Sequence, residues 1–146
     1  MNECLFHDAP DDRRESLLFE IVEQAHRGKN RILVFASDNE RAQALDRMLW
    51  IFRQESFIPH RIFEPGEKIE DVDAEAPAGI VTTEENPIGA NILIADGHCS
   101  LDFACGFDTT HEFVDHSSPD RTEACRERFR DYRARQVSVR HVKSRS

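Results

Sequence analysis

The chain has 146 residues, 39% of them hydrophobic, and a formal charge of −9 from 28 acidic and 19 basic side chains. A chain of this length can bury a core without cross-links, so we expect one domain over residues 1–142 and a short disordered basic tail at 143–146. The longest apolar runs, such as 32–36, are far shorter than a membrane span, and the start is unlike a secretory signal, which together predict a cytoplasmic protein.

The first half of the chain alternates strand-like and helix-like segments. In order, it predicts a short edge strand at 3–7, a helix at 13–27, a buried strand at 31–37 and a helix from Asp38 or Asn39 to Trp50. Gly28 is expected to end the first helix in a left-handed conformation. Such alternation predicts an α/β fold, a single layered domain with a mostly parallel central sheet flanked by helices.

The second half is less regular. It predicts a solvated acidic loop at 64–79, strands at 80–83, 91–95 and around 112–115, and a final helix capped by Ser117 or Ser118 with Pro119 in its first turn. None of the six glycines belongs to a GxGxxG or P-loop motif, and Asp38 in the turn at 36–39 would repel a phosphate. We therefore expect a nucleotide-binding-like topology without a phosphate loop, and no cofactor.

A group of possible metal ligands lies between residues 98 and 116. Its members are His98, Cys99, Cys105, His111 and His116. Their spacing does not match a zinc site, so we expect buried reduced thiols and exposed histidines, and no metal. Asp96 is a candidate catalytic carboxylate after a strand, but Asp96-Gly97 is also an ordinary turn. Because no set of acid, base and nucleophile converges, the sequence favours a noncatalytic protein.

The final helix carries a basic stripe. Residues 121–146 hold nine basic and three acidic side chains, a local charge of +6 that leaves −15 on the rest. Arg126, Arg130 and Arg133 share one helix face, and Phe129 lies at its apolar border. Guanidinium groups beside an apolar pocket suit an acidic peptide that ends in an aromatic residue. A solvated helix face, or contact with DNA phosphates, would use the same residues.

A single tryptophan, Trp50, closes the second predicted helix, and Phe57 follows in an irregular segment. Large aromatic residues at such places either pack into the core or anchor a partner protein. Five segments then carry a family resemblance. They are RILV at 31–34, ALD at 44–46, LW at 49–50, ESFIPH at 55–60 and ACRERFRDYR at 124–133. With these motifs the chain resembles, over essentially its whole length, the chi subunit of bacterial DNA polymerase III holoenzyme.

The resemblance implies a noncatalytic accessory subunit of the clamp loader, an adaptor in DNA replication. It implies that Arg126, Phe129 and Arg130, with Arg121 and Arg133 nearby, hold the acidic, phenylalanine-ended C-terminal tail of single-stranded-DNA-binding protein. It implies a second site for the psi subunit at Trp50, Phe57, Pro59 and His60, a face that another partner could also use. Nucleic acid would then be contacted mostly indirectly, and a membrane not at all.

The sequence departs from the family pattern at two tail-site positions. Thr122 stands where the family uses a lysine, and Phe129 stands where a tyrosine is typical. Two other functions stay open beside the adaptor. One is a small α/β metal-dependent enzyme that uses Asp96, His98 or the cysteine and histidine cluster, and the other is direct nucleic-acid binding by the basic C-terminal segment.

Overall fold

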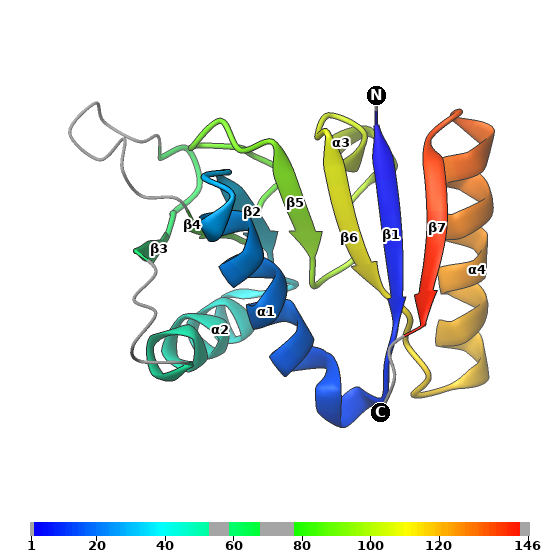
Figure 1. Ribbon diagram of the computed structural model, residues 1–146, viewed down its shortest axis with the longest axis horizontal. Coiled ribbons are helices and arrows are strands. Elements are labelled where there is room, and N and C mark those ends of the chain that lie inside the picture. Colours follow the sequence, from blue (N-terminus) through cyan, green and yellow to red (C-terminus); the bar gives the residue numbers. More distant parts are fainter. Residues whose placement is uncertain (1, 53–58, 68–77, 144–146) are drawn as a thin grey trace.

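Seven parallel strands form one sheet in the computed structural model, which describes residues 2–52, 59–67 and 78–143 (Figure 1). The strands are β1 (Glu3–Asp8), β2 (Ile32–Phe35), β3 (His60–Ile62), β4 (Ala78–Val81), β5 (Ile92–Ala95), β6 (Thr109–Phe113) and β7 (Ser138–Lys143). Their order across the sheet is β3-β4-β2-β5-β6-β1-β7, and every neighbouring pair is parallel. The predicted α/β fold with a parallel central sheet is confirmed.

Helices cover both faces of the sheet. They are α1 (Arg14–Arg27), α2 (Asn39–Ile51), α3 (Leu101–Ala104) and α4 (Pro119–Ala134), with a 3₁₀ turn, η1 (Asp11–Arg13), before α1. In β2, Ile32 and Val34 pack with α1 and α2, whereas Leu33 and Phe35 pack in the second core with residues of α3 and α4. Because both faces of β2 are covered, its sequence is an unbroken apolar run rather than an alternating one.

The predicted helix starts are confirmed by their caps. The Asp38 side chain accepts a hydrogen bond from the backbone N–H of Arg41 at 2.7 Å, and the Ser118 hydroxyl accepts one from that of Arg121 at 3.2 Å. The prediction for the end of α1 is wrong by one residue. Gly28 has φ −80°, and Lys29 takes the left-handed conformation with φ +60°. The next N–H, that of Asn30, then bonds to the Ala25 carbonyl and closes the helix end.

Several strands differ from the sequence prediction. The segment 3–7, predicted to be an edge strand, lies inside the sheet between β6 and β7, because the unpredicted β7 pairs along its whole length. β3 and α3 were not predicted either, and β4 and β6 begin two and three residues before the predicted strands. Lys143, predicted to start a disordered tail, is the last residue of β7, and 144–146 and most of the predicted acidic loop, 68–77, lie outside the described residues.

Candidate functional site

A pocket of about 180 Å³ lies between α4 and the carboxyl ends of β1 and β7. Its lining residues come from four segments: Phe6, Asp8, Val114, His116, Thr122, Cys125, Arg126, Phe129 and His141. Alternation along β1 turns Phe6 and Asp8 toward α4, and the parallel register sets His141 of β7 beside Phe6. The pocket is therefore assembled by the pairing of β1 with β7 and by the packing of α4 on that pair.

The base of the pocket is apolar. The rings of Phe6 and Phe129 lie 5.4 Å apart between centroids, and Phe6 also meets the edge of Tyr132. Cys125 is buried beside them, its thiol donates to the Phe113 carbonyl at 3.8 Å, and burial raises its pKa. These contacts make Cys125 a packed thiol rather than a reactive one, and they give the pocket a rigid aromatic wall.

The rim of the pocket carries an exposed cation. The Arg126 side chain is 69% exposed, and its Nη1 lies 3.7 Å from the Glu123 carboxylate. Arg130 Nη2 donates to the other oxygen of Glu123 at 3.0 Å. Glu123 is thus shared between two exposed arginines, and such surface pairs exchange readily for a stronger anionic partner.

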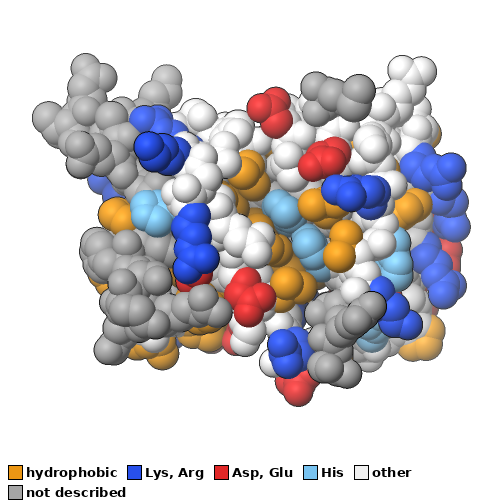
Figure 2. All heavy atoms as spheres, viewed as in Figure 1, with side chains coloured by type: hydrophobic (Ala, Val, Ile, Leu, Met, Phe, Trp, Pro, Cys, Tyr) orange, Lys and Arg blue, Asp and Glu red, His pale blue; other side chains and the backbone are white. Residues whose placement is uncertain are grey.

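The other predicted tail residues are more widely spread. Arg133 is exposed and does not line the pocket. Arg121 lines a different cavity and donates to Asp115 at 3.2 Å. Thr122, where the resemblance implies a lysine, does line the pocket, and its hydroxyl donates to the Asp115 carbonyl at 2.9 Å. Figure 2 shows several Lys and Arg side chains along the edge of the molecule where α4 and β7 lie, in addition to others elsewhere on this face.

Arg128, which the sequence analysis did not single out, points inward from α4. Its Nε donates to Glu112 of β6 at 2.9 Å, its Nη2 donates to the second carboxylate oxygen at 2.5 Å, and its Nη1 donates to the Cys99 carbonyl at 2.8 Å. The Tyr132 hydroxyl also donates to Glu112, and burial raises the pKa of Tyr132. Arg128 occupies the same helix stripe as Cys125 and Tyr132, so its spacing is a signal for an inward orientation.

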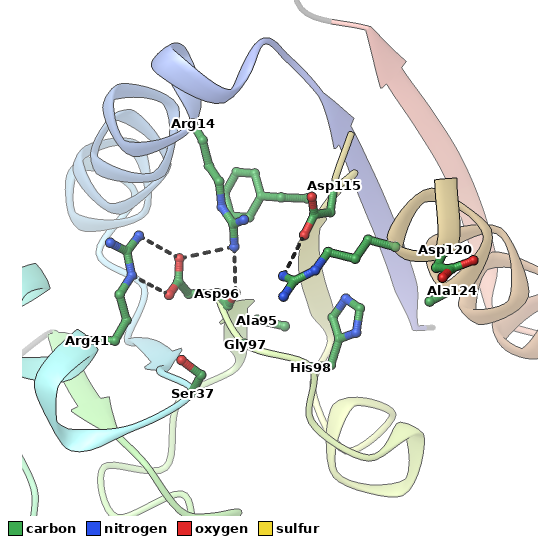
Figure 3. A pocket seen from close by; sticks show the side chains of 12 residues that line it. Arg14, Ser37, Arg41, Ala95, Asp96, Gly97, His98, Asp115, Asp120 and Ala124 are labelled. Atoms are coloured by element: carbon green, nitrogen blue, oxygen red, sulfur yellow. Dashed lines mark hydrogen bonds and ion pairs between the residues drawn. The ribbon is translucent and has the colours of Figure 1, made fainter. Parts of the chain in front are cut away.

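A larger cavity of about 510 Å³ lies at the carboxyl ends of β2, β5 and β6, where open parallel sheets commonly bind nucleotides (Figure 3). Its centre is Asp96, which follows β5. Arg41 donates to both Asp96 carboxylate oxygens, at 2.8 and 3.1 Å, and Arg14 donates to its backbone carbonyl at 2.5 Å. The hydrogen bonds with Asp96 raise the pKa of Arg41. Asp96 therefore occupies the position that an anionic ligand would take between these two arginines.

The turn predicted not to hold phosphate is closed by backbone contact. A Cβ atom on Gly97 would lie 2.9 Å from the backbone nitrogen of Ser37, so only glycine fits there. The Gly97 N–H donates to the Phe35 carbonyl at 3.0 Å. The connection after β5 thus packs directly on the turn between β2 and α2.

The possible metal ligands do not converge. His111 stacks on His7 at 5.1 Å, His116 contacts Asp8, and Cys99 is buried with its pKa raised to about 11 by burial. Burial also lowers the pKa of His7 to about 4 and that of His111 to about 3. Within the described part of the chain, no group of three or more His, Cys, Asp or Glu side chains is arranged to hold a metal ion.

The predicted partner site lies at the opposite edge of the sheet. Trp50, at the end of α2, is 48% exposed, and the neighbouring Ile51 is also exposed. The Trp50 ring lies 4.5 Å from that of His60, the first residue of β3, and His60 is buried beside Asp46. Pro59 is half-buried next to them, and Phe57 lies outside the described residues. Trp50 and Ile51 thus form an exposed, largely apolar surface over the buried His60 ring, here called the tryptophan face.

Residues 1–140 match the family described as "DNA polymerase III chi subunit, HolC". The DNA polymerase III subunit chi of Escherichia coli (strain K12) is 30% identical over 120 residues, which cover 82% of this chain and 78% of that protein. The DNA polymerase III subunit chi of Pseudomonas aeruginosa PAO1 is 31% identical over 113 residues, which cover 77% and 74%. The chain belongs to the DNA polymerase III chi subunit family.

Membership of the chi family confirms the resemblance found in the sequence. It supports a noncatalytic accessory subunit in DNA replication, the class of function that the sequence predicts. Over the residues that the structure describes, no helix has the length and apolar character needed to cross a bilayer.

Sequence reasoning missed half of the pocket of this chi-family chain. Phe6, Asp8 and His141 come from strands at the two ends of the chain, and His116 comes from the segment before α4. The alternation within β1 was a usable signal that Phe6 and Asp8 share a face. That they face α4 and His141 depends on a pairing between residues more than 130 positions apart.

Proposed function

We propose that this chi-family protein is a replication adaptor that holds the acidic C-terminal tail of single-stranded-DNA-binding protein in the α4 pocket. The observation that carries the proposal is the pocket itself, an aromatic cavity with an exposed arginine at its rim. A terminal phenylalanine ring would fill the space beside Phe6 and Phe129. Carboxylates of the tail would replace Glu123 as partners of Arg126 and Arg130.

The same geometry predicts binding that is selective without being tight. The pocket accepts one ring, so only a small apolar area is removed from water. The arginines are exposed and screened by salt, so each ion pair contributes modestly. The basic edge formed by α4 and β7 would nevertheless attract an acidic tail from a distance and speed its encounter.

The tryptophan face is the proposed site for the clamp-loader connection, through the psi subunit or another protein. It lies beside β3 at one edge of the sheet, and the α4 pocket lies beside β1 and β7 at the other edge. Because the two sites use different helices and opposite edges, both partners can bind at once. Tethering of this kind raises the effective concentration of the clamp loader at coated single strands without an active site.

The first test is a calorimetric titration of the protein with a synthetic peptide of the acidic, phenylalanine-ended tail. We expect saturable binding by the wild type. Binding should weaken about tenfold or more in Arg126→Ala and on replacement of the terminal phenylalanine of the peptide by alanine, and it should weaken less in Arg130→Ala. Arg47→Ala removes an exposed arginine of α2 and serves as the matched control, with unchanged binding.

The outcome that would overturn the proposal is equal binding by wild type and Arg126→Ala, or no binding by the folded wild type. A parallel titration with single-stranded DNA alone separates the adaptor from a direct nucleic-acid-binding protein. Tight DNA binding that falls steeply with salt would favour the latter.

A further inference from the structure

Asp8 lies between two histidines at the mouth of the α4 pocket. One carboxylate oxygen contacts Nε2 of His116 at 2.5 Å, and the other contacts Nε2 of His141 at 2.8 Å. All three residues line the pocket, and both histidine side chains are about half exposed. The hydrogen bond from His116 lowers the pKa of Asp8, which keeps this carboxylate ionised. The proposed peptide site thus contains an anion of its own beside the space for the terminal ring.

The charges around this group come from every neighbouring element. Arg126 faces it from α4, His141 and Lys143 from β7, and His116 from the segment after β6. Asp115 in that segment is bound to Arg121 and Ser117. His7 is next to Asp8 in β1, but alternation turns it to the other face, where it stacks on His111 and burial lowers its pKa to about 4. His116 and His141 are therefore the two imidazoles in contact with Asp8 whose protonation would change the charge of this group.

The charge of the mouth depends on these two imidazoles. When both are neutral, the Asp8 carboxylate repels an incoming carboxylate. When both are protonated, their two positive charges outweigh the single negative charge of Asp8, and the group becomes a net cation beside Arg126. Imidazole is the side chain that changes charge between pH 5 and 8.

We propose that Asp8, His116 and His141 form a proton-dependent subsite that receives the terminal carboxylate of the peptide whose last ring fills the pocket. The proposal rests on the function proposed above and adds residues that decide which anion is accepted and at which pH. An anionic ligand favours the protonated imidazoles, so binding takes up protons. By linkage, affinity then rises as the pH falls from 8 to 6. Peptide carboxylates stay ionised over this range, so their own titration does not produce the effect.

The test is a calorimetric titration of the full chain with the tail peptide at pH 6, 7 and 8 and constant ionic strength. We expect binding about fivefold tighter at pH 6 than at pH 8, with net proton uptake seen as a dependence of the heat on the buffer. The double variant His116→Gln/His141→Gln should bind with little pH dependence. His26→Gln, which alters a histidine of α1 outside the pocket, is the matched control and should keep the wild-type response.

Two further measurements keep the proposal distinct from its premise. Asp8→Asn removes the competing carboxylate and should bind about threefold tighter than wild type at pH 8. A peptide with an amidated C-terminus should lose most of the pH response. Tail binding that does not change with pH, or that changes equally for the amidated peptide, overturns the subsite and leaves the adaptor intact. No binding at any of the three pH values overturns both, and circular dichroism of each variant verifies the fold.

Discussion

The two cavities that α4 helps to line differ in what their arginines bind. The larger one, about 510 Å³, lies at the usual ligand-binding edge of a parallel sheet, yet Arg14 and Arg41 are both bound to Asp96. Its third arginine, Arg121, is 70% exposed but bound to Asp115, a largely buried carboxylate. The smaller one, about 180 Å³, has Arg126 at its rim, 69% exposed and only loosely paired with Glu123. Judged by volume, the larger cavity is the better candidate for a ligand site. Judged by how its arginines are already paired, the smaller pocket is the better candidate.

A cation is available to a ligand only where it is exposed and where its existing partners are weak. In the larger cavity the carboxylate of Asp96, itself buried, is held by two guanidinium groups. A phosphate would have to displace it and leave a buried charge without partners, which is costly. In the α4 pocket the exchange of one exposed carboxylate for another costs little.

The largest effect on stability is expected from replacing Arg128, because this residue anchors α4, the helix that both cavities share. Arg128→Ala leaves Glu112, 1% exposed, without its guanidinium partner and should lower the free energy of unfolding by about 3–5 kcal/mol in urea denaturation. Arg128→Lys keeps the charge but not the two-pronged geometry and should lose less. Arg133→Ala, an exposed arginine of the same helix, is the control and should change stability by less than about 0.5 kcal/mol. A small effect of Arg128→Ala would contradict an anchoring role.

A smaller loss of stability is expected from replacing Asp96 in the larger cavity. Asp96→Ala removes the shared partner of two arginines that are roughly a quarter exposed, so solvent offsets part of the loss and we expect about 2 kcal/mol. If Asp96 does occupy an anion position, inorganic phosphate should raise the Tm of the variant and leave the wild type unchanged. Equal stabilisation of both proteins would show that the arginines are available despite Asp96. Asp102→Ala, at an exposed carboxylate, controls for the loss of charge.

The smallest effect is a change in tail binding, expected from replacing Glu123 at the rim of the α4 pocket. Glu123→Gln removes the carboxylate that competes for Arg126 and Arg130, and should strengthen tail binding about two- to fourfold at low salt. High salt should abolish most of this gain, because the pairs are exposed. Glu127→Gln makes the same change in charge one residue from Arg126 and tests whether net charge alone explains the result. An equal gain in both variants would argue against a specific release of the two arginines.

Much of the fold could be predicted from local patterns. Asp38 and Ser118 marked the starts of α2 and α4, and the apolar run in β2 marked a central strand, because caps and periodicity act over a few residues. β7 was missed for a physical reason. It is an edge strand with mostly exposed side chains, so its sequence lacks the apolar pattern on which strand prediction depends.

The candidate site was predicted in part. The helical spacing of α4 singled out Arg126 and Phe129, which line the pocket, but it treated the arginines of the helix as one basic group. Arg128 differs from the other arginines of α4 because it points inward and binds Glu112 of β6. The spacing from Cys125 to Tyr132 was an unused signal for an inward orientation of Arg128, but the buried carboxylate that it binds could be located only in the tertiary structure.

Fold class, family and the helix that carries the basic stripe could all be predicted without a structure, since they depend on composition, short motifs and local periodicity. Tertiary structure decided which charges are available. Asp8, His116 and His141 meet across more than 100 residues of chain, and Asp96 is bound to arginines 55 and 82 positions away. Such contacts depend on strand order, register and helix packing, which no local pattern encodes. They distinguish a cavity whose inner arginines bind its own carboxylate from a pocket whose rim arginine is exposed.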